Sequence, residues 1–176
     1  QSLRPPPPGP HFAVPGCRRL GVDCGSPGAT TALFRFHPHF NLPREGTLHP
    51  YPSVDPTPAH LPLSVKPTPW PNVDLIPSNL ELFDVEYELA AGGADGQSVL
   101  AARFRKLKQG LMDLARDYDG VILDPPPALG TISLAVMQAA NALLVPLAAT
   151  TPDFCSTVQF LSMMDQVLEQ LVGAGI

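Results

Sequence analysis

The sequence lacks most of the features that place a protein in a membrane, outside the cell or on nucleic acid. No apolar run approaches the ~20 residues of a membrane-spanning helix, and Arg4 is followed by prolines rather than by the apolar region of a signal peptide. A net charge of −5 gives no basic footprint for nucleic acid. The cysteines Cys17, Cys24 and Cys155 are odd in number and lack metal-site spacing, so we expect buried, small side chains in a reducing cytoplasm.

Proline is unusually frequent, and its uneven distribution divides the chain into two parts of different composition. Of the 23 prolines, 17 fall within residues 1–71, and all five histidines fall within the first 60. Because proline fixes φ and donates no backbone hydrogen bond, residues 1–10 and 37–69 are expected to be irregular and poorly packed. The composition predicts a Pro-rich N-terminal part, 1–70, and a more regular part, 71–176. Together they are long enough for one domain with a core.

Short apolar runs alternate with helical patterns along the chain. The runs predict strands near residues 19–23, 73–76, 119–123 and 142–146. The patterns between them predict helices over 80–91, 98–117, 131–140 and 153–172. Such alternation favours right-handed βαβ units, so the predicted fold class is α/β, a partial doubly wound and mostly parallel sheet.

The clearest functional signal lies between Asp119 and Pro152. An apolar run ends on Asp124, and three prolines follow it: Pro125, Pro126 and Pro127. A carboxylate at the carboxyl end of a buried parallel strand lies where doubly wound folds bind their ligands. The prolines stop the strand and stiffen the loop. In nucleoside triphosphatases this arrangement is the Walker B motif, whose Asp helps to hold Mg²⁺.

These residues resemble the ParA family of partition ATPases, and within it the ParA and RepA proteins of plasmids. These proteins are P-loop ATPases with a deviant Walker A motif. The resembling segments are LDPPPALG (123–130), SLAVMQAANALLVPL (133–147), TPDFCSTVQFL (151–161) and PNVDLIPSNLELFDVEYELA (71–90). The resemblance covers residues 71–176 well and residues 1–70 poorly, and it implies a sheet of the P-loop NTPase type.

The resemblance also implies roles for individual residues. Asp124 would hold Mg²⁺ through a water molecule, and the three prolines after it would form the switch loop that senses the γ-phosphate. Thr151 and Pro152 would lie near the adenine base. Asp23, at the end of the strand 19–23, would help to position the metal and the attacking water. The residues alone also allow plainer interpretations, such as a turn or capping Asp and a rigid proline turn.

The sequence departs from the family pattern in two places. The family motif at Asp23 continues Asp-x-Asp-Pro-Gln, whereas this chain has Gly25 for the second Asp and Ser26-Pro27 for Pro-Gln. No G-x-x-x-x-G-K-[ST] motif occurs in the sequence. In the family that motif lies just before the helix that ends near Gly16. The chain is therefore expected to be incomplete at both ends and inactive as an ATPase on its own.

At the level of function, the resemblance implies an ATPase of plasmid or chromosome partition in the bacterial cytoplasm, associated with the nucleoid or a plasmid. Its cofactors would be ATP and Mg²⁺. Its partners would be a ParB- or RepB-type centromere-binding protein, nonspecific DNA and a second copy in a nucleotide-dependent dimer. The alternative is a non-catalytic fragment, or the product of a decayed gene, that keeps only a partner-binding surface. A MinD-like regulator is a weaker alternative, because it would need a C-terminal amphipathic helix.

Overall fold

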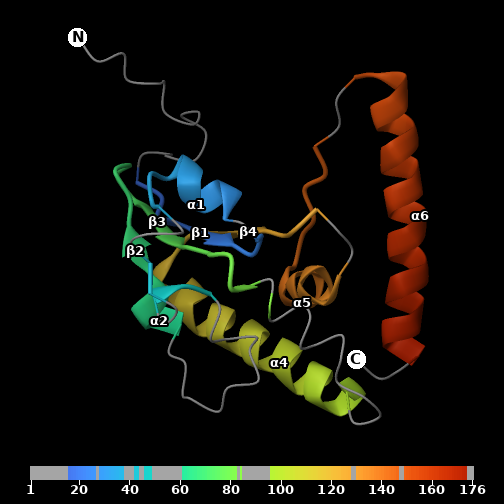
Figure 1. The fold of residues 1–176 in the computed structure, drawn as a ribbon, viewed down its shortest axis with the longest axis horizontal. Helices are drawn as coiled ribbons and strands as arrows, with labels where there is room; N and C mark the ends of the chain where they lie inside the picture. Colours follow the sequence, from blue (N-terminus) through green and yellow to red (C-terminus); the bar gives the residue numbers. More distant parts are fainter. Residues whose placement is uncertain are drawn as a thin grey trace. The chain divides into compact units, whose positions relative to one another are not determined.

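The chain forms two compact units, Gln1–Asn141 and Ala142–Ile176, which we describe separately. The computed structural model describes residues 16–26, 28–37, 42–43, 46–48, 61–82, 84, 96–127, 130–146 and 149–173. In the first unit, helices surround a four-stranded sheet (Figure 1). In the second unit, residues 142–146 and 149–150 are irregular, and the long helix α6 spans Thr151–Gly173.

The sheet of the first unit has the strand order β2-β3-β1-β4. The central strand β1 (Arg19–Asp23) pairs in parallel with β3 (Val73–Ile76) on one side and with β4 (Gly120–Asp124) on the other. The two-residue strand β2 (Lys66–Pro67) pairs antiparallel with β3 at the edge. The prediction of a partial, mostly parallel α/β sheet is therefore confirmed, with β4 shifted by one residue from the predicted range.

The helices of the first unit cover both faces of the sheet. Figure 1 shows α1 (Ala29–Leu33) on one side and α4 (Gly96–Leu114) and α5 (Thr131–Ala139) on the other, as in a doubly wound fold. A 3-10 turn, η2 (Ala115–Asp117), joins α4 to β4. The helices predicted over 98–117, 131–140 and 153–172 are confirmed with small shifts at their ends. The helix predicted over 80–91 lies mostly outside the described residues.

Apolar side chains of the sheet and the helices form the core. The strands contribute Leu20, Val22, Val73, Leu75 and Ile76, all at most 1% exposed. On one face Phe34 packs against β3, with the ring of Trp70 edge-on at 5.1 Å between centroids. Helix α4 buries leucines at helical spacing: Leu107, Leu111 and Leu114. Each fully buried leucine stabilises the fold by about 1.5–3 kcal/mol.

The proline-rich segment 37–69 is better packed than the sequence predicts, wherever it is described. Leu48 and Leu61 are fully buried, and the Ser64 hydroxyl donates to the Thr47 carbonyl at 2.9 Å. The expectation of poor packing is therefore wrong for these residues. Proline is tolerated in the first turn of a helix and on an edge strand, and these are the places it takes in α2 (Leu61–Ser64) and in β2. Residues 1–15, 38–41, 44–45 and 49–60 lie outside the described part.

The strand predicted over 142–146 does not form. These residues are irregular in the second unit and join no ladder among the described strands. A short apolar run becomes a strand only where a neighbour satisfies its backbone groups, and the sequence pattern cannot supply that neighbour. Pro146 also lacks a backbone donor. Among the helices that the structure describes, α6 included, none is both long and apolar enough to cross a membrane.

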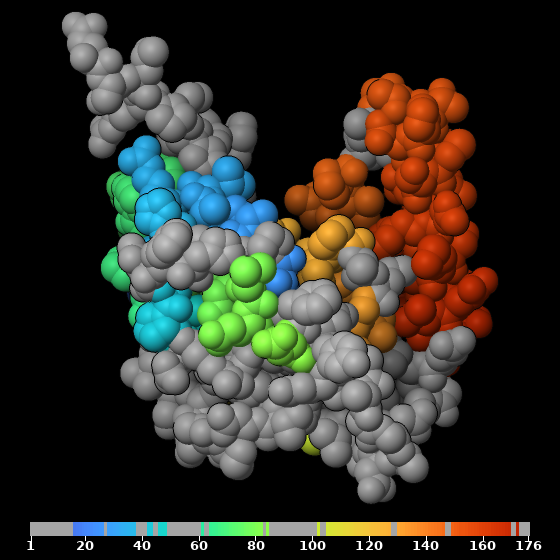
Figure 2. Space-filling model, in the orientation of Figure 1, coloured from blue at the N-terminus to red at the C-terminus, as the bar shows by residue number. Residues whose placement is uncertain are grey.

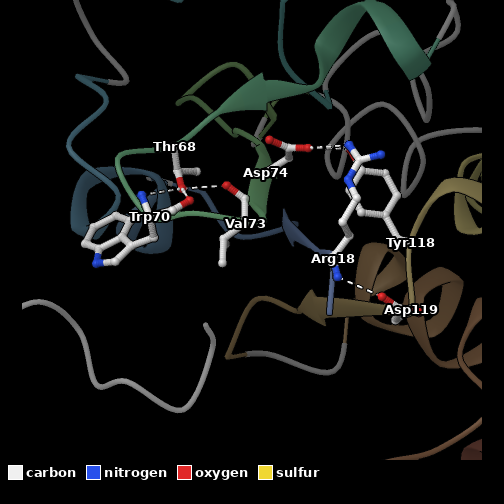
Figure 3. Close-up of polar contacts among 7 residues, drawn as sticks. All are labelled: Arg18, Thr68, Trp70, Val73, Asp74, Tyr118 and Asp119. Atoms are coloured by element: carbon white, nitrogen blue, oxygen red, sulfur yellow. Dashed lines mark hydrogen bonds and ion pairs between the residues drawn. The ribbon is translucent and has the colours of Figure 1, made fainter. Parts of the chain in front are cut away.

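A polar cluster joins the starts of β1 and β4 to β3 (Figure 3). The Arg18 guanidinium lies 3.2 Å from the Asp74 carboxylate and 4.8 Å from the centroid of the Tyr118 ring. The Tyr118 hydroxyl donates to the same Asp74 oxygen at 2.8 Å, and the Arg18 backbone N–H donates to the Asp119 carboxylate at 2.7 Å. Because the strands are parallel, this cluster fixes the sheet at the end opposite to Asp23 and Asp124.

Tyr118→Phe tests the contribution of this cluster through the dependence of stability on pH. Burial and the hydrogen bond to Asp74 raise the pKa of Tyr118 to about 12. Since an unfolded tyrosine ionises near pH ~10, the folded protein keeps this proton longer, and stability falls as the pH rises from about 10 to about 12. The effect should be below ~1 kcal/mol because Tyr118 is partly exposed. Urea unfolding of both proteins between neutral pH and pH 11.5 (about half a unit below the Tyr118 pKa) measures it, and equal pH profiles would contradict it.

Candidate functional site

The two aspartates that the sequence singles out are neighbours at the carboxyl ends of β1 and β4. The parallel register pairs Asp23 with Asp124, and the Cys24 N–H donates to the Asp124 carbonyl at 2.9 Å, one residue beyond the strand. The sequence predicts both aspartates at strand ends, and the register shows that the two strands are neighbours. The fold therefore places both acidic groups where a parallel α/β sheet binds ligands.

Asp23 is almost completely buried and its carboxylate is already engaged within the protein. Its Oδ1 accepts the Gly25 N–H at 3.0 Å. Its Oδ2 accepts both the backbone N–H and the hydroxyl of Thr31, each at 2.7 Å. Because Thr31 lies in the first turn of α1, the carboxylate satisfies a helix N–H that has no partner within the helix. Asp23 thus fixes the start of α1 against the end of β1.

Burial raises the pKa of the Asp23 carboxyl above its ordinary value. The hydrogen bonds from Thr31 and Gly25 work in the opposite direction, and the neighbouring Asp124 carboxylate adds to the rise. Burial likewise raises the pKa of the Cys24 thiol, and Cys24 is 1% exposed. Cys24 is therefore the buried, small side chain that the sequence predicts, whereas Cys17 is half-buried and Cys155 is exposed, contrary to that expectation.

The network around Asp23 extends to the loop that follows β3. The Thr31 hydroxyl accepts the Ser78 N–H at 2.8 Å, and the Ser26 hydroxyl donates to the Leu80 carbonyl at 3.4 Å. In the space-filling view, α1 (blue) and the segment after β3 (light green) reach the surface on the same face (Figure 2). One buried and one exposed hydrogen bond therefore connect the segment after β1 to the loop after β3. Sequence reasoning missed Ser78 and the hydroxyl of Thr31.

Asp124 is exposed, unlike its register partner. Its Oδ2 accepts the hydroxyl of Thr30 at 2.5 Å, within the range of a charge-assisted hydrogen bond. A carboxylate offers about four lone-pair sites, so one hydrogen bond leaves others for water or a cation. Sequence reasoning also missed Thr30. The signal available was a pair of hydroxyl residues, Thr30 and Thr31, just after the turn that follows Asp23.

One of the prolines after Asp124 contacts α5. Pro126 is partly buried, and its carbonyl accepts the Ser133 hydroxyl at 3.3 Å, whereas Pro125 and Pro127 are exposed. The loop is thereby tied to the helix that follows it. Its assignment as a switch loop at the γ-phosphate stays a prediction.

Thr151 and Pro152 are the first two residues of α6, in the second unit. The Thr150 hydroxyl and the Asp153 side chain hydrogen-bond to each other, and the Asp153 N–H donates to the Thr150 hydroxyl at 3.3 Å. This arrangement is a helix N-cap. The expectation that Thr151 and Pro152 lie near the adenine base stays a prediction.

The described residues could supply one contact to a Mg²⁺ ion but not a complete set of ligands. Among the described residues, no group of three or more His, Cys, Asp or Glu side chains could hold a metal. Mg²⁺ is usually bound through one or two carboxylates together with waters and substrate phosphates. The exposed Asp124 suits one such contact. Asp23 does not suit such a contact, because it is 1% exposed and its two oxygens already accept three hydrogen bonds.

Gly25 stands where the family pattern has its second Asp, and the structure has room for a side chain there. An added Cβ would lie 3.4 Å from Asp23 Oδ1, an ordinary contact. By contrast, Gly28 has a φ of +82° at the turn into α1, where a side chain would be strained. The loss of the second Asp is therefore not imposed by the backbone.

The sheet order, the helices on both faces and the strand-end Asp define a doubly wound α/β domain, and no phosphate-loop motif occurs in this sequence. A protein-family model described as AAA domain matches residues 59–172. The chain belongs to this family, and its relatives include a plasmid partition protein A of Escherichia coli.

SopA, McdA and one synthase of known structure illustrate the similarity. The chain is 31% identical over 161 residues to protein SopA of Escherichia coli K12, which covers 91% of this chain and 41% of SopA. It matches apo McdA of Cyanothece with 30% identity and a TM-score of 0.67, covering 90% of this chain and 57% of McdA.

The third relative binds nucleotide in its solved structure. Cobyrinic acid a,c-diamide synthase of Mycobacterium smegmatis, with bound ATP analogue and magnesium, matches with 26% identity and a TM-score of 0.66, over 88% of this chain and 57% of that one. A fold shared with a synthase does not by itself decide the function of this chain. The chain also spans less than half the length of SopA.

Proposed function

We propose that this chain is part of an ATPase that partitions plasmids or chromosomes. The observation that carries the proposal is Asp124, an exposed carboxylate at the carboxyl end of β4, in register with Asp23. A strand-end carboxylate of this kind is how nucleoside triphosphatases hold Mg²⁺ beside the phosphates. The family membership over residues 59–172 points to the same chemistry.

In the proposed site each described residue has a separate task. Asp124 accepts hydrogen bonds from water molecules around Mg²⁺, which when bound would neutralise charge on the phosphates. Asp23 shapes the site by fixing α1 and the loop after β3. Pro125, Pro126 and Pro127 form the stiff loop that faces the γ-phosphate, and Thr151 and Pro152 contact the base.

The partners follow from the same family membership. We infer nonspecific DNA, a ParB- or RepB-type centromere-binding protein and a nucleotide-dependent second copy as partners, with association to the nucleoid or a plasmid. Arg105, Lys106 and Lys108 on α4 have exposed side chains, but such a run is more commonly a solvated helix face. We therefore do not assign DNA binding to α4.

A second candidate is a non-catalytic role. One observation favours it, namely Gly25 in place of the family's second Asp. A protein of this kind would keep its folded surface for a partner but would turn over no nucleotide.

Two ATPase assays test the proposal and separate the two candidates. The 176-residue chain should hydrolyse ATP no faster than buffer, because the phosphate loop and its lysine supply most of the electrostatic stabilisation. The protein extended through the coding sequence upstream of Gln1 should show Mg²⁺-dependent turnover. An upstream reading frame without a phosphate loop, or an extended protein without turnover, would favour the non-catalytic role.

A further inference from the structure

Two consecutive threonines of α1 each hold one of the paired aspartates. Thr31 donates its N–H and its hydroxyl to Asp23, and Thr30 donates its hydroxyl to Asp124 at 2.5 Å. Successive side chains of a helix point roughly 100° apart, and paired strands lie only ~4.8 Å apart. A hydroxyl group carries a single proton, so one threonine hydroxyl donates to only one of the two carboxylates, and two successive threonines can serve both.

The position of Thr30 is fixed independently of Asp124. Its neighbour Thr31 is fully buried and bridges Asp23 to the Ser78 N–H, and Phe34 at the end of α1 packs against β3. Buried Gly28, with a φ of +82°, sets the turn that starts the helix. Thr30 is thus a donor held in place by the core, and it faces a carboxylate that is otherwise exposed.

We propose that Thr30 is a positioning residue that holds the Asp124 carboxylate in one orientation. An exposed aspartate samples several rotamers, and ordering it at the moment of metal binding costs conformational entropy. A hydrogen bond from an anchored helix removes part of that cost in advance. The orientation of Asp124 should improve its contact to Mg²⁺ or to a water bound to Mg²⁺, and only this consequence rests on the proposed function. The orientation itself needs no metal.

The experiment uses the whole isotope-labelled chain and compares Thr30→Val, which keeps the shape and removes the hydroxyl, with Thr30→Ser, which keeps the hydroxyl. The first readout is the set of three-bond couplings that report the Asp124 side-chain rotamer without metal. We expect one rotamer in the wild type and in Thr30→Ser, and averaged couplings in Thr30→Val. Unchanged Gly25 and Gly28 amide shifts show that α1 stays folded.

The second readout is a titration with Mn²⁺ alone, followed by the broadening of the Cys24 amide. Thr30→Val should need roughly threefold more Mn²⁺ for half-broadening, and Thr30→Ser should not. Thr157→Val is the matched control, because the Thr157 hydroxyl donates to the Asp153 carbonyl within α6.

The two readouts separate this inference from the proposed function. Averaged Asp124 couplings in the wild type, or unchanged couplings in Thr30→Val, would overturn the role of Thr30. If Asp124→Asn leaves the Cys24 broadening unchanged, the metal role of Asp124 fails, whereas the coupling result still decides whether Thr30 orients the carboxylate.

Discussion

Asp23→Ala should lower the free energy of unfolding by about 3–5 kcal/mol. The substitution removes the acceptor of three hydrogen bonds from a site that is 1% exposed. The N–H of Gly25 and the N–H and hydroxyl of Thr31 would lose their partner in a place with little access to water, and each unsatisfied buried donor costs about 1–3 kcal/mol. Loosening Thr31 would also weaken its contact with Ser78.

Urea unfolding of the whole chain, monitored through the single tryptophan, measures this loss. Asp113→Ala is the control, because Asp113 is an exposed aspartate of α4 and should change stability by less than ~0.5 kcal/mol. Asp23→Asn should fall between the two. It keeps one carbonyl acceptor and avoids the burial cost that raises the pKa of Asp23, but its amide group faces other donors. A loss below ~1 kcal/mol for Asp23→Ala would show that the network is not structural.

The sequence was sufficient for the parallel sheet and for its two strand-end aspartates. Short apolar runs that end on a carboxylate define the strand and its end at the same time, so Asp23 and Asp124 could be placed before the register was known. The apolar stripe of α4 was equally visible, because Leu107, Leu111 and Leu114 recur at helical spacing and are all buried.

Two features depend on tertiary contacts that a sequence pattern does not contain. Residues 142–146 have the composition of a strand, but pairing decides whether one forms, and in the described structure they have no strand neighbour. The prolines between 37 and 69 argued against packing, yet Leu48 and Leu61 are fully buried. Proline removes donors but does not prevent the residues between prolines from entering a core.

The partners of the Thr30 and Thr31 hydroxyl groups could not be predicted from the sequence for a different reason. Each bonds to a residue on another element, over separations of 94 residues for Thr30 with Asp124 and 8 residues for Thr31 with Asp23. Only the register of β1 with β4 brings the two carboxylates under one helical turn. The difference between a buried and an exposed aspartate at equivalent strand positions likewise appears only in the folded chain.

Asp124→Asn should have the opposite effects to Asp23→Ala, with a large loss of ATP turnover and little loss of stability. In the protein extended upstream of Gln1, Mg²⁺-dependent ATP turnover should fall by about 100-fold, because the amide removes the negative charge that attracts the hydrated cation. The free energy of unfolding should change by less than ~0.5 kcal/mol, since Asp124 is exposed and an Asn oxygen can still accept from Thr30.

Measuring turnover against Mg²⁺ concentration together with urea unfolding separates the two roles. If Asp124 and Asp23 differ as their environments imply, Asp23→Ala will lose more stability and Asp124→Asn will lose more ATP turnover. Unchanged turnover in Asp124→Asn would remove Asp124 from the proposed metal site. A stability loss as large as that of Asp23→Ala would instead make both aspartates parts of one structural network. Two carboxylates paired in register are not equivalent, because the buried Asp23 is already hydrogen-bonded within the protein whereas the exposed Asp124 remains accessible.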